Sequence, residues 1–246
     1  MSESLMTAAD AYGVLGTAYD AWCHSVTEDI GFYVDLAIES GGPVLEIGVG
    51  SGRIAVPTAL AGVSVVGVDL SEEMLDLAWA KALPHRASLR LVRADMRALP
   101  DLGSFALVTV PFRALLHLPD DEQRLAVLHA LHQRLRPGGR LAFDVFHPDR
   151  IDIEETQGRW LEREPGILER ADWRPQEQNL TLTVRTRGRE ATMELWWAEP
   201  RAWAGLLAQA GFDQVERYGG FNGEPLRIDS PDSVWVATAA ASAAAG

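Results

Sequence analysis

The sequence predicts an α/β domain of the doubly wound type, in which helices cover both faces of a mostly parallel sheet. From residue 43 to residue 146, short apolar runs rich in β-branched residues alternate with longer segments of helical periodicity. This alternation is typical of parallel strands joined by right-handed crossovers. A glycine-rich turn follows the first apolar run, at the edge of the sheet where such folds bind ligands. After residue 150, strand-like runs follow one another without helices, which predicts a small antiparallel insertion.

Five apolar runs before residue 150 predict buried parallel strands. They are residues 43–47, 64–68, 89–92, 105–110 and 140–146. Helices are predicted between them, at residues 53–61, from Ser71 onward, and at 120–135. Ser71 is expected to cap its helix, because Glu72 and Glu73 follow in the first turn. The sequence Arg136-Pro137-Gly138-Gly139 predicts a helix stop and a turn.

The remaining elements complete one predicted domain. Strands are expected at 167–173, 180–187 and 191–197, with a hairpin at Gly188, and again at 212–217 and 233–237. Helices are expected at 7–21, 28–39 and 199–210. We therefore expect a helical cap over residues 1–42, a core over 43–149, the antiparallel insertion over 150–198, the end of the core over 199–238 and a flexible tail over 239–246.

Composition excludes several classes of protein. The chain has 246 residues, of which 47% are hydrophobic and 23% charged, enough apolar material for one sizeable core. Cys23 is the only cysteine, so a disulfide framework is excluded. No apolar run is long enough to span a membrane, and the first residues lack the pattern of a secretory signal. A reducing cytoplasm is the expected location.

The charge balance disfavours nucleic acids and anionic membranes as partners. The formal net charge is -13, and residues 1–52 contain eight acidic residues but no lysine or arginine. Nucleic-acid binding requires a basic surface that displaces phosphate counterions, and none is visible. A small neutral or cationic substrate fits better, although for the net charge alone the preferred explanation is that acidity keeps the protein in solution.

The glycine-rich turn predicts a nucleoside site. Gly48, Gly50 and Gly52 lie between a strand and a helix, where glycine lets the backbone turn tightly and approach a ligand. Asp69 follows Gly48 by 21 residues, at the end of the second strand. A carboxylate there accepts hydrogen bonds from ribose hydroxyls, so the loop and the acid together indicate an adenosine-type ligand. A turn that serves packing alone is the competing interpretation.

Two residues distinguish between a dinucleotide and SAM as the ligand. The dinucleotide fingerprint G-x-G-x-x-G requires a third glycine where this chain has Arg53. Glu46 precedes the loop, where an acid repels a pyrophosphate but orients the ammonium and sulfonium region of S-adenosylmethionine (SAM) through neighbouring groups. SAM is therefore favoured, and an NAD-dependent oxidoreductase remains the alternative enzyme class.

Four segments resemble the motifs of the class I SAM-dependent methyltransferases. They are residues 44–53, 66–75, 94–97 and 135–141. The resemblance covers residues 10–150, resumes near 199–237, and is closest in kind to natural-product N- and O-methyltransferases acting on small molecules. It implies a Rossmann-like sheet of seven mostly parallel strands, with SAM as the methyl donor and S-adenosylhomocysteine (SAH) as the product.

The resemblance also implies roles for individual residues. The three glycines would pass under the methionine and ribose, Asp69 would hold the ribose, Leu70 and Met74 would pack on the adenine, and Asp95 would accept from the adenine amine beside Met96. Ala18-Tyr19-Asp20 is similar to a Tyr-Asp pair that folds over SAM, and Arg53 is a substitute for a missing basic residue near the methionine carboxylate. The expected cofactor-binding residues are Tyr19, Glu46, Gly48, Gly50, Gly52, Arg53, Asp69, Leu70, Met74, Asp95, Met96 and Pro111.

Acceptor-binding residues are expected near the ends of strands four and five and in the cap. Methyl transfer from a sulfonium is an in-line displacement, which needs alignment and requires a base only when the nucleophile is protonated. His117 is the first candidate for a base or orienting group, because its segment resembles the Phe-x-x-x-x-His loop of small-molecule methyltransferases. Asp144 with His147 is a second candidate pair. The expected substrate-binding residues are Tyr12, Trp22, Arg113 and His147.

The function expected from the sequence is SAM-dependent methyl transfer to an amine or hydroxyl of a small molecule, as in secondary metabolism. The acidic cap favours an amine over a hydroxyl. No metal is expected, because His129 and His132 lack a third ligand nearby. Tryptophans of the insertion are expected to pack it onto the sheet, to line an acceptor pocket, or to form a homodimer contact. A non-catalytic SAM-binding module is the alternative outside enzymes.

Overall fold

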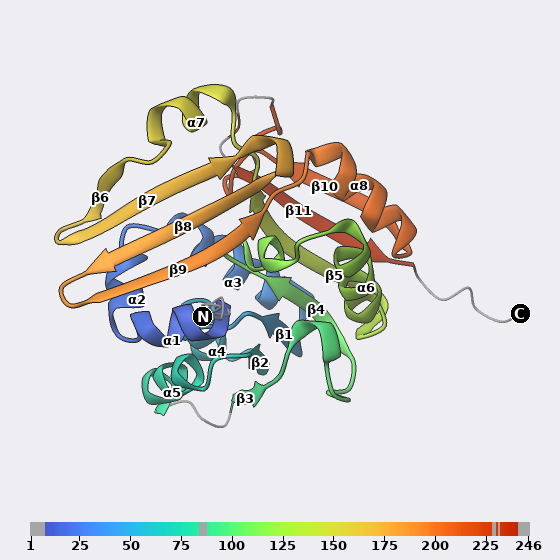
Figure 1. Cartoon of the computed structure of the whole chain (residues 1–246). Coiled ribbons are helices and arrows are strands. Elements are labelled where there is room, and N and C mark those ends of the chain that lie inside the picture. Colours follow the sequence, from blue (N-terminus) through green and yellow to red (C-terminus); the bar gives the residue numbers. More distant parts are fainter. Residues whose placement is uncertain (1–7, 84–87, 228–229, 231, 241–246) are drawn as a thin grey trace, which may run out of the picture.

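Seven strands form the central sheet in the order β10-β11-β5-β4-β1-β2-β3 (Figure 1). The computed structural model describes residues 8–83, 88–227, 230 and 232–240. The strands are β1 (Val44–Ile47), β2 (Val65–Asp69), β3 (Leu89–Arg93), β4 (Phe105–Val110), β5 (Leu135–Phe146), β10 (Phe212–Tyr218) and β11 (Asp232–Ala239). Neighbouring strands pair in parallel along β5-β4-β1-β2-β3. Strand β11 pairs antiparallel with both β5 and β10. The predicted doubly wound sheet is therefore confirmed.

Helices pack on both faces of this sheet. One face is covered by α3 (Glu28–Ser40), α4 (Ala55–Leu60) and α5 (Glu72–Lys81), whose apolar residues share a core with β2 and β3. The other face is covered by α6 (Asp121–His132) and α8 (Pro200–Gln209). Trp203 of α8 is fully buried there, and Phe143 stacks on Trp235 at 6.0 Å. Ser71 caps α5 by accepting from the N–H of Met74, as the sequence predicted.

The antiparallel insertion is a four-stranded sheet in the order β6-β7-β8-β9. Its strands are β6 (Trp160–Glu164), β7 (Ile167–Arg174), β8 (Asn179–Thr186) and β9 (Arg189–Trp196), and the turn at Gly188 joins the last two. Helix α7 (Arg150–Thr156) and strand β6 were not predicted. One face of this sheet packs on α1 (Ala8–Leu15) and α2 (Ala18–Trp22) through a third apolar core, so the cap and the insertion support each other.

Two predicted helices differ in the structure. The helix expected at 7–21 is broken, because Gly16 adopts a left-handed backbone (φ +50°) between α1 and α2. The helix expected at 120–135 ends at His132, because Leu135 already pairs with Phe105 as the first residue of β5. Pro137-Gly138-Gly139 therefore lies at an irregularity within β5 and not ahead of it. The tail expected over 239–246 lies outside the described residues from 241 onward, and Ala239 ends β11.

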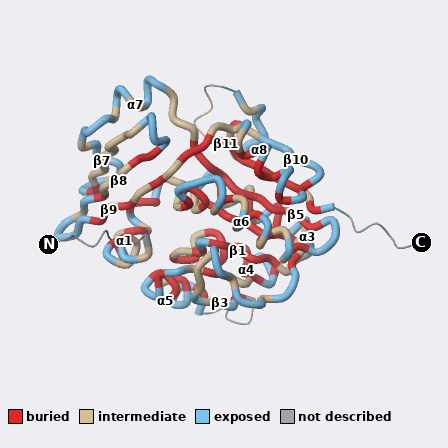
Figure 2. Tube along the Cα trace, turned by 45° about the vertical axis from the view of Figure 1, so that its right-hand side comes forward, coloured by how far each residue is buried: buried red, intermediate tan, exposed pale blue. Residues whose placement is uncertain are grey.

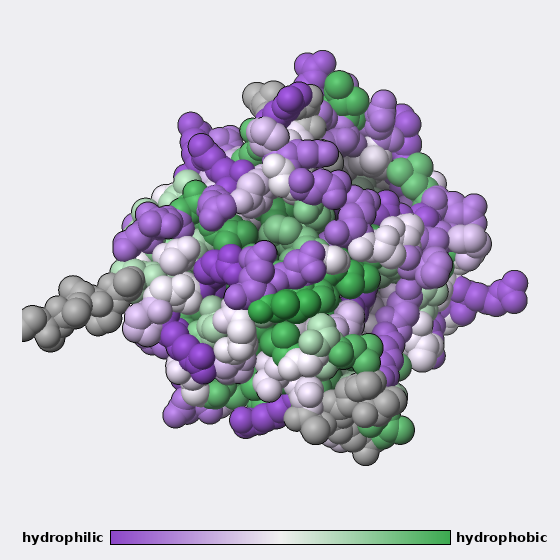
Figure 3. All heavy atoms as spheres, turned by 180° about the vertical axis from the view of Figure 1, so that it is seen from behind, coloured by the Kyte–Doolittle hydropathy of each residue, from purple (hydrophilic) through white to green (hydrophobic). Residues whose placement is uncertain are grey.

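Burial concentrates in the seven-stranded sheet, whereas α7 and much of β6 and β7 are more exposed (Figure 2). On the face opposite the view of Figure 1, hydrophilic residues cover most of the rim and apolar residues gather toward the middle (Figure 3). Among the described residues, no helix is long and apolar enough to cross a membrane.

Candidate functional site

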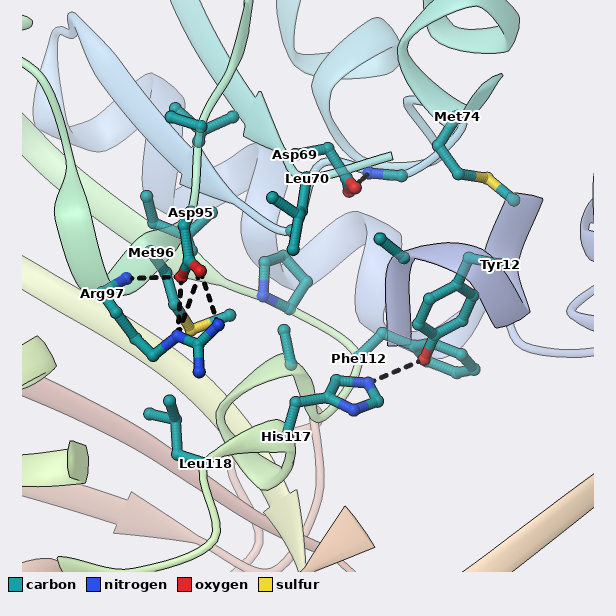
Figure 4. A pocket seen from close by; sticks show the side chains of 18 of the residues that line it. Tyr12, Asp69, Leu70, Met74, Asp95, Met96, Arg97, Phe112, His117 and Leu118 are labelled. Atoms are coloured by element: carbon teal, nitrogen blue, oxygen red, sulfur yellow. Dashed lines mark hydrogen bonds and ion pairs between the residues drawn. The ribbon is translucent and has the colours of Figure 1, made fainter. Parts of the chain in front are cut away.

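A cavity of about 670 Å³ lies at the carboxyl ends of β1, β2 and β4 (Figure 4). We call it the first cavity. Most of the residues predicted to bind the cofactor line it, together with the predicted base. These are Tyr19, Gly48, Gly50, Asp69, Leu70, Met74, Asp95, Met96, Pro111 and His117. The structure therefore brings together residues from five segments that the sequence singled out separately.

The glycine loop is attached to the end of β2 by Asp69. The N–H of Gly50 donates to Oδ2 of Asp69 at 2.8 Å, and the N–H of Ser71 donates to Oδ1 at 2.9 Å. Burial raises the pKa of Asp69, and these two N–H groups oppose the shift. Gly48 has φ +67°, and a Cβ there would come within 2.9 Å of Ala114 Cβ. Only glycine lets the loop pass under the short helix that carries His117.

Apolar side chains and an ion pair complete the lining of the first cavity. Asp95 accepts from the backbone N–H of Arg97 at 2.9 Å and from its Nη2 at 2.6 Å. The side-chain hydrogen bond from Arg97 lowers the pKa of Asp95. Met74 is fully buried, whereas Leu70 is 39% exposed and faces the cavity. The sequence motif identified Asp95 and Met96 but gave no signal that Arg97 also lines the cavity.

Three of the predicted cofactor residues do not line the first cavity. Arg53 binds Asp29 of α3 in a bidentate ion pair, with distances of 2.7 and 2.6 Å. Glu46 is 2% exposed, accepts from the N–H of Ala55, and has its pKa raised to about 8 by burial. Gly52 packs against Ala78. These residues lie beneath the loop, and they join it to α3, α4 and α5 without facing the first cavity.

A cluster of hydrogen bonds and an ion pair holds helix α2 over the glycine loop. Asp20 accepts from the Ser51 hydroxyl at 2.5 Å and from Nζ of Lys81 at 2.6 Å. This lysine is the only one in the chain. The aromatic rings of Tyr19 and Tyr12 lie 5.7 Å apart, and both residues line the first cavity.

A second cavity of about 590 Å³ lies between the cap, the end of β5 and the four-stranded sheet. Its walls carry large apolar side chains. These include Trp22, Phe146, Trp173, Leu180, Leu182, Met193 and Leu195. Of the predicted substrate residues, Tyr12, Trp22 and Arg113 line this cavity, and His147 lines neither cavity. Because β7, β8 and β9 supply much of the wall, the insertion contributes directly to the site.

Tyr12, Phe112 and His117 line both cavities. The Tyr12 hydroxyl lies 2.9 Å from Nε2 of His117, and Figure 4 shows the two side chains pointing toward each other. Burial lowers the pKa of His117 to about 4, and a hydrogen bond to the backbone of Glu194 opposes the shift. The imidazole is therefore neutral near pH 7 and presents a nitrogen at the boundary between the cavities.

The turn that carries Phe112 is strained. Phe112 (φ +53°) and Arg113 (φ +65°) are consecutive non-glycine residues in the left-handed region, where backbone strain is often found at functional sites. The Phe112 N–H donates to Oδ1 of Asp144 at 2.8 Å, and Arg113 pairs with Asp232 at 2.7 Å. The sequence did not predict Phe112 as a lining residue. The turn that places it depends on a positive φ, and no sequence pattern predicts a positive φ at a phenylalanine.

Comparison with known proteins finds methyltransferases. Residues 44–139 match a family model described as a methyltransferase domain. Cypemycin N-terminal methyltransferase from a Streptomyces species is 28% identical over 210 residues, which cover 80% of this chain and 82% of that protein. The structure of the CcbJ methyltransferase from Streptomyces caelestis is similar with a TM-score of 0.83 and 27% identity, covering 94% of this chain and 98% of that one.

A further neighbour shares the fold. It is the SAM-bound structure of CalS10, an amino pentose methyltransferase from Micromonospora echinaspora, with a TM-score of 0.64 and 21% identity. The match covers 92% of this chain and 96% of that one. The chain spans only about half the length of two other curated relatives, methyltransferases from Geobacillus and Bacillus subtilis. Residues 44–139 therefore match a methyltransferase domain, and the whole chain has the fold of known SAM-dependent methyltransferases.

Proposed function

We propose that this protein transfers the methyl group of SAM, held in the first cavity, to an amine or hydroxyl of a small molecule held in the second. The observation that carries the proposal is the shared boundary. Tyr12, Phe112 and His117 line both cavities, so a group that leaves one and enters the other must cross at these side chains. An in-line displacement requires donor and acceptor to meet at one such point.

The first cavity suits SAM in its chemistry. Asp69 offers carboxylate oxygens at the end of β2, where ribose hydroxyls bind in folds of this kind. Leu70, Met74 and Met96 offer apolar surface for the adenine, and the glycine loop keeps the floor free of side chains. When bound, SAM supplies an electrophilic methyl group on a sulfonium. We assign Glu46, Gly52 and Arg53 to shaping the loop from beneath.

The neutral state of His117 favours an orienting role. A histidine with a pKa of about 4 takes up little proton near pH 7, so it serves best as a hydrogen-bond acceptor for the incoming nucleophile or for Tyr12. A neutral ring beside a sulfonium also avoids repulsion between two positive charges. His117 therefore aligns the acceptor, and proton removal is left to another group or to water.

The natural-product relatives support a small-molecule acceptor. One of them is named as an N-terminal methyltransferase, and another as an amino pentose methyltransferase. The second cavity has the size of a small-molecule site, and the insertion supplies much of its wall. We infer an amine acceptor first and a hydroxyl second.

Calorimetric titration with SAH, and separately with NADH, tests the cofactor. We expect micromolar binding of SAH and none of NADH. Binding of NADH alone would indicate that the protein is an NAD-dependent oxidoreductase instead. A protein that binds SAH but shows no methyl transfer to any amine or phenol in a broad panel would instead be a non-catalytic SAM-binding module.

A further inference from the structure

The wall of the second cavity carries an excess of negative charge. Six carboxylates line it against three guanidinium groups. The carboxylates belong to Glu28, Asp29, Asp144, Asp152, Glu169 and Asp232, and the guanidiniums to Arg113, Arg159 and Arg163. In a site enclosed by apolar side chains, such an excess attracts a cation more strongly than it would on an open surface.

Two of these carboxylates are held in ion pairs within the protein. Asp29 is bound by Arg53, and Asp232 is bound by Arg113. Glu169 accepts a hydrogen bond from the indole of Trp22. The ion pairs compensate the charges of Asp29 and Asp232, whereas Glu169 is only partly buried and is therefore solvated.

Asp144 differs from them. It is 3% exposed, at the end of β5, and among the described residues it forms no ion pair. Two neutral donors hold its Oδ1: the Tyr33 hydroxyl at 2.6 Å and the Phe112 N–H at 2.8 Å. Burial raises the pKa of this carboxyl to about 6. The nearby charge of Arg113 opposes this shift only in part, so the carboxylate is still costly to bury, and a cationic ligand would reduce that cost.

Asp144 also lies close to the boundary between the cavities. Its partner Phe112 is one of the three residues that line both of them. A ligand group bound at Asp144 therefore lies near the boundary that Tyr12 and His117 form with Phe112. Around this point the wall is apolar and aromatic, with Trp22, Phe146 and Trp173 supplying surfaces for the body of a ligand.

We propose that the methyl acceptor is an organic amine with an apolar or aromatic body, whose ammonium form is recognised by Asp144 and releases one proton to solvent before its lone pair attacks the methyl group and SAH leaves. This inference rests on the proposed function and specifies its substrate class. The apolar walls bind the body, and the carboxylate selects the cation over a neutral group of the same shape. Arg113 is paired with Asp232 and lies over the ring of Phe146 at 5.1 Å, and its charge acts on Asp144 without contact in an ion pair.

The test compares 2-phenylethylamine with its neutral counterpart 2-phenylethanol. Each is titrated into the full-length protein saturated with SAH, and tryptophan fluorescence and calorimetry report binding. We expect the amine to bind about tenfold more tightly than the alcohol or better. D144N retains an oxygen for Tyr33 and Phe112, and it should remove this preference while SAH affinity stays within about twofold. The matched control is E28Q, which changes another carboxylate of the same cavity and should keep the preference.

The outcomes are distinct. Failure of the wild type to bind SAH would overturn the proposed function itself. If SAH binds, then equal affinity for amine and alcohol, an amine preference that survives D144N, or no binding of the amine at millimolar concentration overturns the role of Asp144. Melting temperatures establish that each variant is folded. If D144N is not folded, the wild-type comparison decides, because equal affinities there already contradict the proposal.

Discussion

The Tyr12 hydroxyl and Nε2 of His117 lie 2.9 Å apart, although 105 positions separate them in the sequence. Tyr12 belongs to α1 of the cap, and His117 ends the short helix that follows β4. Their contact joins the cap to the edge of the main sheet at the boundary between the two cavities. The boundary is therefore complete only when the cap is in place.

Replacing Tyr12 by phenylalanine tests this boundary. Y12F keeps the ring and removes the hydroxyl that faces His117, so the alignment of an acceptor should suffer more than the binding of the cofactor. We expect kcat to fall about tenfold or more while the Kd for SAH changes by less than about threefold. H117A should behave in the same way. The measurements are steady-state kinetics and calorimetry.

His147 provides the control for that experiment. It was predicted from the sequence to bind substrate, but it lines neither cavity. H147A should therefore leave kcat and KM within about twofold of the wild type. A large loss in H147A together with full activity in Y12F and H117A would contradict the assignment of the boundary.

Asp69 and Asp95 should contribute unequally to cofactor affinity. Asp69 fixes the glycine loop through Gly50 and faces the cavity, so D69A should weaken SAH binding about 100-fold, as expected for two charge-assisted hydrogen bonds. Asp95 is already engaged by Arg97, and D95A should cost about tenfold or less. Calorimetry with SAH measures both. Unchanged affinity in folded D69A would remove the proposed ribose contact.

The sequence predicted those parts of the fold that short-range patterns specify. β4 matches its predicted bounds, and the glycine loop, Asp69 and the cap of α5 lie where the motifs indicated. Each depends on residues close together in the chain: alternation in a strand, a turn glycine, or an N-cap serine.

Features that depend on long-range contacts were not predicted. Arg53 was expected near the cofactor, yet Asp29 lies 24 positions away and binds it with both carboxylate oxygens. The second cavity requires the insertion to close over β5, and the strained backbone at Phe112 is held by Asp144 from another strand. No local pattern encodes which distant charge will meet which, so these relationships appear only in the folded chain.

The Arg53–Asp29 pair should be important for stability. Asp29 has a side chain that is 1% exposed, and Arg53 is 14% exposed. Removing one partner leaves a buried charge without compensation, so D29A should lower the free energy of unfolding by about 3 kcal/mol or more in urea denaturation. The control is E72A, which breaks the exposed pair with Arg93 and should cost less than about 1 kcal/mol. Equal losses would contradict the structural role of the buried pair.

Glu46 should make stability depend on pH in a defined direction. Burial raises its pKa to about 8 in the folded protein, so between its unfolded pKa and about pH 8 the folded state binds more protons than the unfolded state. Stability from this group is therefore full at acidic pH and is lost as the pH rises through 8. Glutamine does not titrate and can still accept the Ala55 N–H, so E46Q escapes this loss. We expect E46Q to melt about 3 °C or more above the wild type at about pH 9, with the gap closing or reversing at about pH 5. E39Q, at a side chain that is 64% exposed, should show a nearly constant gap over the same range. A constant gap for E46Q as well would mean that the Glu46 carboxyl titrates normally beneath the loop.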